Sequence, residues 1–269
     1  MFHTDRFFFV PTREVTMQDV TPSLHIAEPE FIEQRWHEYT AEQHDVWRVL
    51  YERRMADLKT TGSEVYLRGA ERIGLCPDLV PDLAVVNEKL AGLTGWRAVA
   101  VNGFIPAPEF FRCLSGRKFP TTVIVRPREQ LDYLPEPDIF HDVFGHVPLH
   151  ASPAFADYLQ RFGQIACRAE REEQIRGMAR LFWFTVEFGL VREEGRVKAY
   201  GSGLISSHAD GVHALGPNCE RRPFSVDAVL AQSFEIDHVQ PVLFVIDSLG
   251  LLFHAAQEAA QKLGIPEAV

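Results

Sequence analysis

Apolar side chains recur at helical spacing over much of this chain, most clearly in two long stretches. In residues 31–59 the apolar and aromatic positions follow one face of a helix: Phe31, Trp36, Tyr39, Val46, Leu50 and Met55. Ser152 and Pro153 form a typical helix start, with a capping serine and a proline in the first turn. A second apolar stripe follows them: Phe155, Tyr158, Phe162 and Ile165. These patterns predict a largely helical protein.

Shorter patterns predict further helices and a few strands. Residues 61–64, Thr-Gly-Ser-Glu, match a capping box that would open a helix, and residues 82–91 and 178–191 have helical patterns. The β-branched runs at 99–101 and 121–125 predict short strands. We expect a strand and a glycine-rich turn over 197–207, and a strand leading into a terminal helix over 241–264.

The fold class that these elements predict is mainly α (α+β), a single domain over residues 1–269 with a small β component. No internal repeat, low-complexity tract or long linker divides the chain. Residues 1–30 carry prolines at positions 11, 22 and 29 and little periodicity, so we expect them to form an extended arm along the domain.

Composition and charge narrow the classes of function. The formal net charge is −10, which argues against nucleic acid or an anionic membrane surface as the main partner. The four cysteines are widely spaced, without a CxxC pair, as expected of reduced residues in a cytoplasmic protein. Neither a signal peptide nor an apolar stretch of membrane-spanning length is recognisable.

Two histidines, His141 and His146, interrupt the apolar stretch PDIFHDVFGHVPLH at residues 137–150. On a regular α-helix a step of five residues turns by about 500°, so the two rings would diverge by about 140°. Gly145 and Pro148 both favour helix ends, and a helix that stops near Gly145 would let His146 turn back towards His141. The sequence therefore permits the rings to converge but does not require it.

A third candidate ligand is Glu187, the single acid in the aromatic stretch MARLFWFTVEFGLV at residues 178–191. A carboxylate buried in such surroundings needs a cationic partner or a metal ion. Arg180 lies about 10 Å away along a helix, too far for a direct bond. Two imidazoles and one carboxylate form the ligand set of non-haem Fe(II) oxygenases, and the same groups also bind catalytic zinc.

Simpler interpretations stay open at this point. Each of the two histidines alone is more typical of a hydrogen-bonded core residue than of a metal ligand. A zinc hydrolase is less favoured, because Asp142 follows His141 and no histidine stands at position 145, so the HExxH pattern is missing. The remaining histidines are expected at the surface or beside the site: positions 3, 25, 37, 44, 150, 208, 213, 238 and 254.

Three stretches, PEPDIFHDVFGHVPL, FWFTVEFGL and KAYGSGLISS, resemble the signature motifs of the pterin-dependent aromatic amino acid hydroxylases. The similarity covers roughly residues 95–250 and is greatest to the bacterial phenylalanine 4-hydroxylases. It implies a single catalytic domain with one Fe(II) held by His141, His146 and Glu187. It also implies a tetrahydropterin, either tetrahydrobiopterin or a bacterial equivalent, and hydroxylation of L-phenylalanine to L-tyrosine with O2.

The resemblance assigns four residues to the substrate. Arg126 stands where the family binds the substrate carboxylate, and Asp138 where a carboxylate orients that arginine. Without the resemblance, Arg126 would be taken as a surface residue at a strand end and Asp138 as a helix N-cap. Ser206 matches a substrate-side hydroxyl, and Trp183 a wall of the substrate pocket that favours phenylalanine or tyrosine over tryptophan.

Three further residues match positions near the pterin. Phe119 corresponds to the aromatic residue that stacks on the pterin ring, Leu114 to a neighbour whose backbone faces it, and Asp142 to a position where many members have glutamate. Phe182 and Leu134 replace a tyrosine and a threonine of the animal enzymes near the site. These differences bear on substrate preference rather than on the iron site.

Together these features predict a cytoplasmic monomer that acts on small molecules. No room exists before residue 31 for the regulatory domain of the animal enzymes, and no heptad repeat of a tetramerisation helix is visible near residue 269. The alternatives are tryptophan hydroxylation by the same chemistry, a zinc hydrolase with the same ligands, and a non-catalytic protein that binds amino acids or metal.

Overall fold

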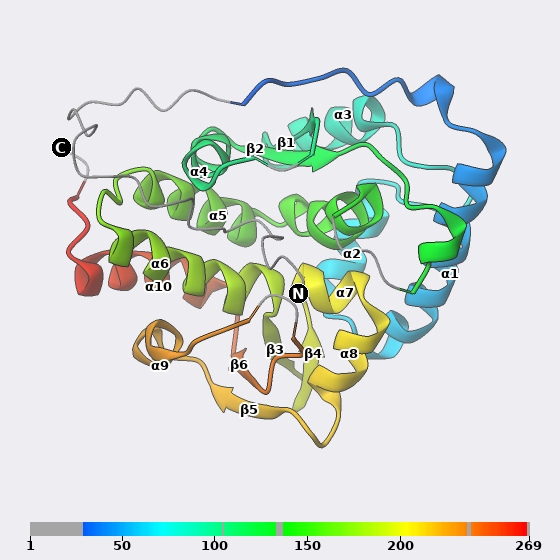
Figure 1. Ribbon diagram of the computed structural model, residues 1–269. Helices are drawn as coiled ribbons and strands as arrows, with labels where there is room; N and C mark the ends of the chain where they lie inside the picture. Colours follow the sequence, from blue (N-terminus) through cyan, green and yellow to red (C-terminus); the bar gives the residue numbers. More distant parts are fainter. Residues whose placement is uncertain (1–28, 104, 133–136, 236–237, 268–269) are drawn as a thin grey trace, which may run out of the picture.

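The computed structural model describes residues 29–103, 105–132, 137–235 and 238–267 and confirms a mainly helical fold with a small β component (Figure 1). The α-helices are α1 (Ala41–Thr61), α2 (Glu64–Arg72), α3 (Leu83–Leu93), α4 (Ala107–Ser115), α5 (Pro153–Ala166), α6 (Glu172–Phe182), α7 (Ser202–Ser206), α8 (His208–Leu215), α9 (Val226–Ala231) and α10 (Gly250–Leu263). The predicted amino-terminal arm lies almost entirely outside the described residues.

Several short helical segments are not α-helical. Three are 3-10 helices, η1 (Trp36–Glu38), η2 (Arg128–Gln130) and η4 (Val147–Ala151), and two are π-helices, η3 (Phe140–His146) and η5 (Trp183–Glu187). The strands are β1 (Arg97–Val101), β2 (Lys118–Thr122), β3 (Leu190–Glu193), β4 (Arg196–Ala199), β5 (Glu220–Pro223) and β6 (Val242–Ile246).

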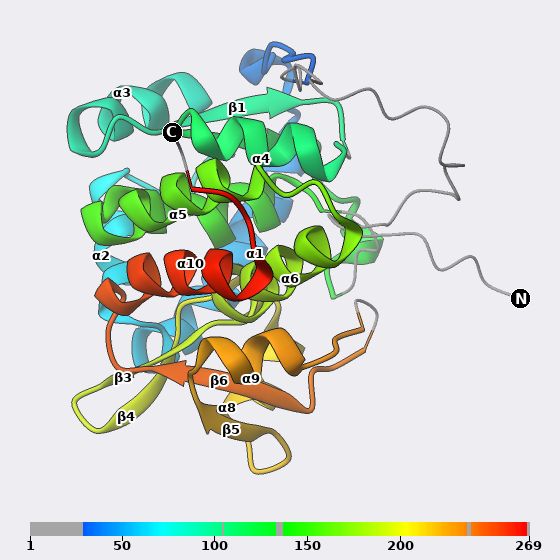
Figure 2. The ribbon, with the colours of Figure 1, turned by 90° about the vertical axis from the view of Figure 1, so that its left-hand side faces the viewer.

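Helix α5 occupies the middle of the molecule and matches its sequence prediction. It begins at Pro153 after Ser152, and its apolar stripe is buried: Phe155, Tyr158, Phe162 and Ile165. Helix α4 covers one side of α5, and α6 and α10 cover the other (Figures 1 and 2). One continuous apolar core therefore surrounds α5 and includes apolar residues of both π-helices.

Two of the predicted helix starts need correction. Residues 31–59 do not form one helix, because α1 begins only after Thr40, whose side chain makes a reciprocal capping box with Gln43. The cap of α2 is Ser63, whose hydroxyl accepts from the Tyr66 backbone N–H. Thr61, expected as that cap, is instead the last residue of α1.

The strands form two small sheets. Strands β1 and β2 pair in parallel, and the second sheet has the order β4-β3-β6-β5 with only the β3–β4 pair antiparallel. The turn between β3 and β4 uses Glu194 and Gly195, both with positive φ. Strand β6 leads into α10, as predicted. The prediction of a glycine-rich turn before residue 207 is wrong, because residues Ser202–Ser206 form helix α7.

Two further features concern the cysteines and the apolar character of the helices. All four cysteines are free, and Cys113 and Cys219 are buried. Within the described part of the chain, no helix has both the length and the apolar character needed to cross a membrane.

Candidate metal centre and active site

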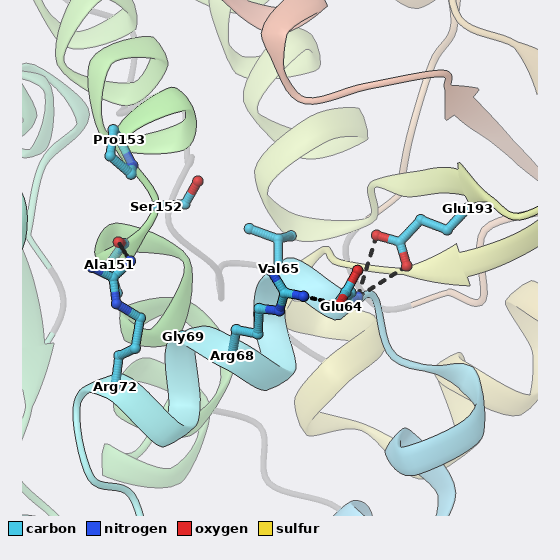
Figure 3. A pocket seen from close by; sticks show the side chains of 9 residues that line it. All are labelled: Glu64, Val65, Arg68, Gly69, Arg72, Ala151, Ser152, Pro153 and Glu193. Atoms are coloured by element: carbon cyan, nitrogen blue, oxygen red, sulfur yellow. Dashed lines mark hydrogen bonds and ion pairs between the residues drawn. The ribbon is translucent and has the colours of Figure 1, made fainter.

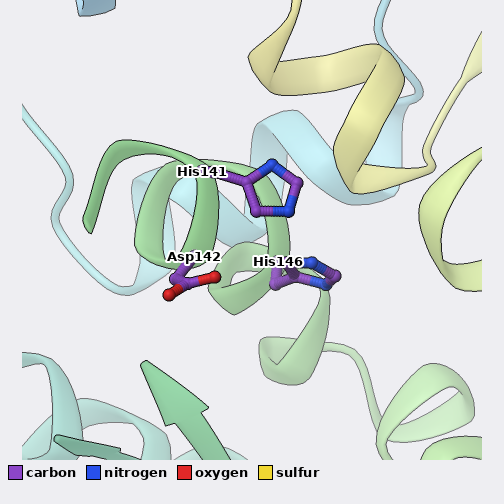
Figure 4. Close-up of side chains that lie close together, drawn as sticks. All are labelled: His141, Asp142 and His146. Carbon is purple, nitrogen blue, oxygen red and sulfur yellow. The ribbon is translucent and has the colours of Figure 1, made fainter. Parts of the chain in front are cut away.

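A π-helix brings His141 and His146 to the same side of their segment (Figure 4). In a π-helix each hydrogen bond joins residues five apart, so a five-residue step makes close to one full turn. The two ring centroids lie 5.0 Å apart, with the planes at 86°. The convergence that the sequence permitted is therefore present, but its suggested cause, a helix end near Gly145, is wrong.

Gly145 has a different role in this arrangement. A Cβ atom at this position would lie only 3.1 Å from the backbone oxygen of Ser202 and 3.2 Å from its Cβ. The missing side chain lets η3 pack directly against α7. The glycine thus permits the close approach of a neighbouring element rather than ending the helix.

Glu187 reaches the two histidines from a second π-helix, η5. The Phe188 backbone N–H donates to the carbonyl of Trp183, five residues earlier, which closes this turn. Glu187 Oε1 lies 3.0 Å from His146 Nε2, and Oε2 lies 3.7 Å from His141 Nε2. The structure thus brings together the three predicted ligands, each of them from a π-helical segment.

These three side chains have the properties of a metal site. His146 Nε2 and Glu187 Oε1 are buried, and apart from their mutual contact at 3.0 Å neither atom has a hydrogen-bond partner within the described residues, although buried polar atoms are normally paired. Burial lowers the pKa of His141 to about 4, so its imidazole is neutral at pH 7. Neutral imidazoles and an ionised carboxylate are what a divalent metal requires, so these residues fit a bound iron ion.

The charge state of Glu187 supports the same conclusion. Burial alone would raise its pKa, but His146, His141 and the hydroxyl of Ser202 outweigh burial and lower it below the usual range. Glu187 is therefore ionised at neutral pH.

Asp142 is also part of this cluster. Its carboxylate lies with His141 and His146 in a group whose ligand atoms are all within 4.8 Å of one another (Figure 4). Asp142 Oδ2 accepts from both the backbone N–H and the hydroxyl of Thr122, each at 2.7 Å, which ties η3 to the end of β2. Burial raises the pKa of Asp142 to about 7, whereas the pKa of Glu187 is lowered below its usual range.

Two serines of α7 contact the candidate ligands. Ser206 donates to the backbone oxygen of Ser202, so His141 Nδ1–H is left to donate to Ser206 Oγ at 2.9 Å. This contact leaves the lone pair of His141 on Nε2, which faces Glu187. Ser202 donates to Glu187 Oε2 at 2.7 Å. Sequence reasoning singled out Ser206 but missed Ser202, because the Gly-Ser-Gly segment was interpreted as a turn.

Arg126 and Asp138 form a nearly buried ion pair beside the cluster. Asp138 accepts from Arg126 Nε at 2.8 Å and from Nη2 at 2.9 Å. The same carboxylate accepts from the backbone N–H of His141 at 3.1 Å. Asp138 thus both orients Arg126 and caps the segment that carries the first histidine, the two alternatives that its sequence position allowed.

Phe119 lies directly against the candidate ligands. Its ring centroid is 4.6 Å from that of His146 and 4.9 Å from that of His150. His150 is buried, with Nδ1 3.0 Å from the backbone oxygen of His146, so it lies behind the site rather than at the surface. Leu114 is buried where α4 packs closely against Gly163 of α5.

Trp183 begins η5 and belongs to an aromatic group. Its ring stacks on Phe234 at 4.6 Å between centroids and also packs on Phe188 at 4.8 Å. Phe234 was not recognised in the sequence, since it follows α9 in an irregular segment without periodicity. Phe182 lies 6.5 Å from the ring of His146, and Leu134 lies outside the described residues.

A separate pocket of about 420 Å³ opens between α2 and the start of α5 (Figure 3). Arg68 pairs with Glu64, Arg72 donates to the backbone oxygen of Ala151, and Glu193 accepts from the backbone N–H of Glu64. None of its lining residues is a candidate ligand, so this pocket is distinct from the metal centre.

Comparisons with known proteins agree with this geometry. The family model of biopterin-dependent aromatic amino acid hydroxylases matches residues 32–266. A phenylalanine-4-hydroxylase of Caulobacter vibrioides is 43% identical over 222 residues, covering 82% of this chain and 76% of the relative. The Chromobacterium violaceum phenylalanine hydroxylase structure with bound Fe(III) has a TM-score of 0.84 at 40% identity and covers 87% of this chain and 85% of its own.

A second structure from Chromobacterium violaceum, with bound iron(III) and 7,8-dihydrobiopterin, has a TM-score of 0.82 at 40% identity, covering 87% of this chain and 86% of its own. The family match spans most of the chain, including both π-helices and α7. The chain belongs to the family of biopterin-dependent aromatic amino acid hydroxylases.

Proposed function

We propose that this protein is a non-haem Fe(II)- and tetrahydropterin-dependent monooxygenase that converts L-phenylalanine to L-tyrosine with O2. The observation that carries the proposal is the convergence of His141, His146 and Glu187, in which the buried atoms His146 Nε2 and Glu187 Oε1 face each other at 3.0 Å and have no other hydrogen-bond partner within the described residues. The related phenylalanine hydroxylases, including those with bound iron and dihydrobiopterin, support it.

His141, His146 and Glu187 hold the iron in this proposal. Bound iron and tetrahydropterin together supply the activation of O2. The protein contributes binding, orientation and exclusion of water. The hydrogen bond between His141 Nδ1–H and Ser206 fixes the tautomer with a free Nε2, and the hydroxyl of Ser202 donates to Glu187 Oε2 and orients that carboxylate.

Arg126 binds the carboxylate of the amino acid substrate. Asp138 occupies the Nε and Nη2 edge of the guanidinium, and Nη1 makes no hydrogen bond to any residue of the described ranges. The end of the guanidinium formed by Nη1 and Nη2 is thus oriented to bind a second carboxylate with two hydrogen bonds. Because Asp138 also caps η3, the substrate carboxylate and His141 are positioned by the same side chain.

In this proposal aromatic side chains form walls for the phenylalanine ring and for the pterin ring. The position of Trp183, stacked on Phe234 and beside Glu187 in η5, supports a role as a wall for the phenylalanine ring. The pterin is assigned to Phe119, Leu114 and Asp142. The contact of Phe119 with His146 and the place of Asp142 beside the two histidines support this assignment.

The cellular setting is proposed from the state of the cysteines. Free cysteines suit a reducing compartment, and we propose a cytoplasmic enzyme on this basis. The continuous apolar core supports one catalytic domain. We further propose that it acts as a monomer on small molecules, which sedimentation of the purified protein would test.

Tyrosine formation by metal-stripped protein tests the proposal. Phenylalanine, tetrahydropterin and O2 are supplied while Fe(II) is added, with Zn(II) in a parallel series. We expect tyrosine to rise with iron, to level off near one equivalent, and to stay absent with zinc. Product with zinc alone, or none with iron in a folded protein, would refute the proposal.

Competition between phenylalanine and tryptophan in one reaction distinguishes phenylalanine hydroxylation from the main alternative, tryptophan hydroxylation. The phenylalanine hydroxylases among the relatives favour phenylalanine over both tryptophan hydroxylation and zinc-dependent hydrolysis. We therefore expect tyrosine as the main product, and a predominance of hydroxytryptophan would assign the chain to the alternative.

A further inference from the structure

Arg54 is a buried cation at a place where the helical pattern requires an apolar residue. It lies in α1 between Leu50 and Leu58, one helical turn from each, and its side chain is only 5% exposed. Its neighbour Arg53 is 55% exposed. A buried guanidinium is costly unless its donors are paired, so the contacts that Arg54 makes explain its position.

Those contacts join α1 to the end of α7. Arg54 Nε donates to the backbone oxygen of Ile205 at 2.8 Å, and Nη2 donates to that of Leu204 at 3.1 Å. Both carbonyls belong to the last turn of α7, where no further turn of helix supplies a partner. Nη1 donates to Asp57 at 2.9 Å, and His208 Nδ1 lies 2.8 Å from the same carboxylate oxygen.

Helix α7 cannot maintain its position without outside contacts. It has five residues, far fewer than an isolated helix needs. At its start, Gly201 approaches Glu187 so closely that an added Cβ would lie 2.5 Å from the Glu187 backbone oxygen. At its other end, Gly211 of α8 leaves space for Arg54, since a Cβ there would lie 3.1 Å from Nη2. Arg54 is therefore the side chain that ties the final carbonyls of α7 to α1.

The same short helix holds both serines that contact the candidate ligands. Ser202 donates to Glu187, and Ser206 receives the Nδ1 proton of His141. A shift of α7 would disturb both contacts together. We propose that Arg54, supported by Asp57 and His208, is a positioning residue that acts through α7 to orient Glu187 and His141. This inference rests on the proposed function for the identity of the ligands.

Cobalt binding to metal-stripped protein tests the inference without relying on turnover. For Arg54→Met we expect the Kd for Co(II) to rise about tenfold, the lower end of what loss of a ligand's hydrogen-bonding partner causes. We also expect a changed Co(II) absorption spectrum and a lower kcat with little change in KM for phenylalanine. Arg54→Lys keeps the charge but not the fork of donors, so it should fall between wild type and Arg54→Met.

Arg168→Met is the matched control. Arg168 also donates to two backbone oxygens, those of Gln164 and Pro266, but makes no contact with α7. Its loss should lower thermal stability while leaving the Kd and spectrum of Co(II) unchanged. If Arg54→Met likewise lowers only the Tm, with cobalt binding as in the wild type, Arg54 is merely structural and the inference is wrong.

A double-mutant comparison tests the route through α7. In a Ser202→Ala, Ser206→Ala background, Arg54→Met should weaken Co(II) binding much less than in the wild type, since its intermediaries are already removed. An undiminished effect would show that Arg54 acts by another route and would overturn the inference.

If Arg54→Met does not fold, Asp57→Asn is tested in its place. We expect this variant to raise the Kd for Co(II) by a smaller factor. An unchanged Kd would contradict the inference. Wild-type protein that binds cobalt but forms no tyrosine would refute the proposed function while leaving this test intact.

Discussion

The π-helix η3 and the α-helix α5 lie a few residues apart in the chain, yet they are built on different principles. In α5 the apolar stripe packs into the core with regular helical geometry. In η3 the segment is also buried, but its backbone follows the rarer π geometry, and Asp142 Oδ1 and His146 Nε2 are buried without hydrogen-bond partners within the described residues. The contrast separates a segment that stabilises the fold from one that positions reactive groups.

The same contrast explains why neighbouring elements must hold the side chains of the site in place. Polar atoms without partners do not stabilise the fold, so the neighbouring elements must hold them in place. Thr122 holds Asp142, Asp138 holds the start of η3, and Ser202 holds Glu187. Substitutions in α5 should therefore change stability, whereas those around η3 should change metal binding.

The largest effect on stability is expected in α5. Leu159 is completely buried, and Leu159→Ala should lower the free energy of unfolding by about 2–5 kcal/mol through lost burial and a cavity. Denaturant unfolding measures this change, and Co(II) affinity of the folded variant should stay at the wild-type value. A loss below about 1 kcal/mol would show that the core around α5 is looser than the burial indicates.

The largest effect on metal binding is expected in η3. His146→Ala removes a proposed direct ligand and should weaken Co(II) binding by more than the roughly 10–100-fold that loss of a ligand's hydrogen-bonding partner causes. Tyrosine formation should disappear, while denaturant unfolding of the metal-free protein should change far less than for Leu159→Ala. Iron binding and turnover that survive this substitution would make His146 a structural residue.

A smaller effect is expected at Ser202. Ser202→Ala removes the hydrogen bond to Glu187 Oε2 and should weaken Co(II) binding by about tenfold. Ser207→Ala is the comparison, since the Ser207 hydroxyl caps α8 by accepting from the Asp210 backbone N–H and touches no ligand. Equal cobalt affinities of the two variants would argue against the support that we assign to α7.

The smallest effect concerns two helix starts. Ser63 caps α2 through its side chain, whereas Ser152 occupies the cap position of α5 without a capping hydrogen bond. Ser63→Ala should cost about 1 kcal/mol of unfolding free energy, and Ser152→Ala much less. Thermal or denaturant unfolding measures both variants. Similar losses of unfolding free energy in Ser63→Ala and Ser152→Ala would mean that the Ser152 hydroxyl contributes to the cap in solution.

The sequence predicts the structure of α5 better than it predicts the structure of η3. Helix α5 was predictable because the proline at its start, its apolar stripe and its length all indicate an α-helix. The three candidate ligands could be proposed from their residue types, but the π geometry that brings them together is invisible to a pattern search based on 3.6 residues per turn. Ser202 was missed because its partner, Glu187, is distant in sequence, and the role of Gly145 depends on the approach of α7.

The central claim is that Glu187, rather than the neighbouring Asp142, completes the metal site with His141 and His146. The most direct test is Co(II) titration of metal-stripped Glu187→Gln and Asp142→Asn, two substitutions that preserve side-chain size. We predict that Glu187→Gln loses most of its Co(II) affinity and that Asp142→Asn retains it. Tight binding by Glu187→Gln together with loss of binding by Asp142→Asn would contradict this account and make Asp142 the third ligand.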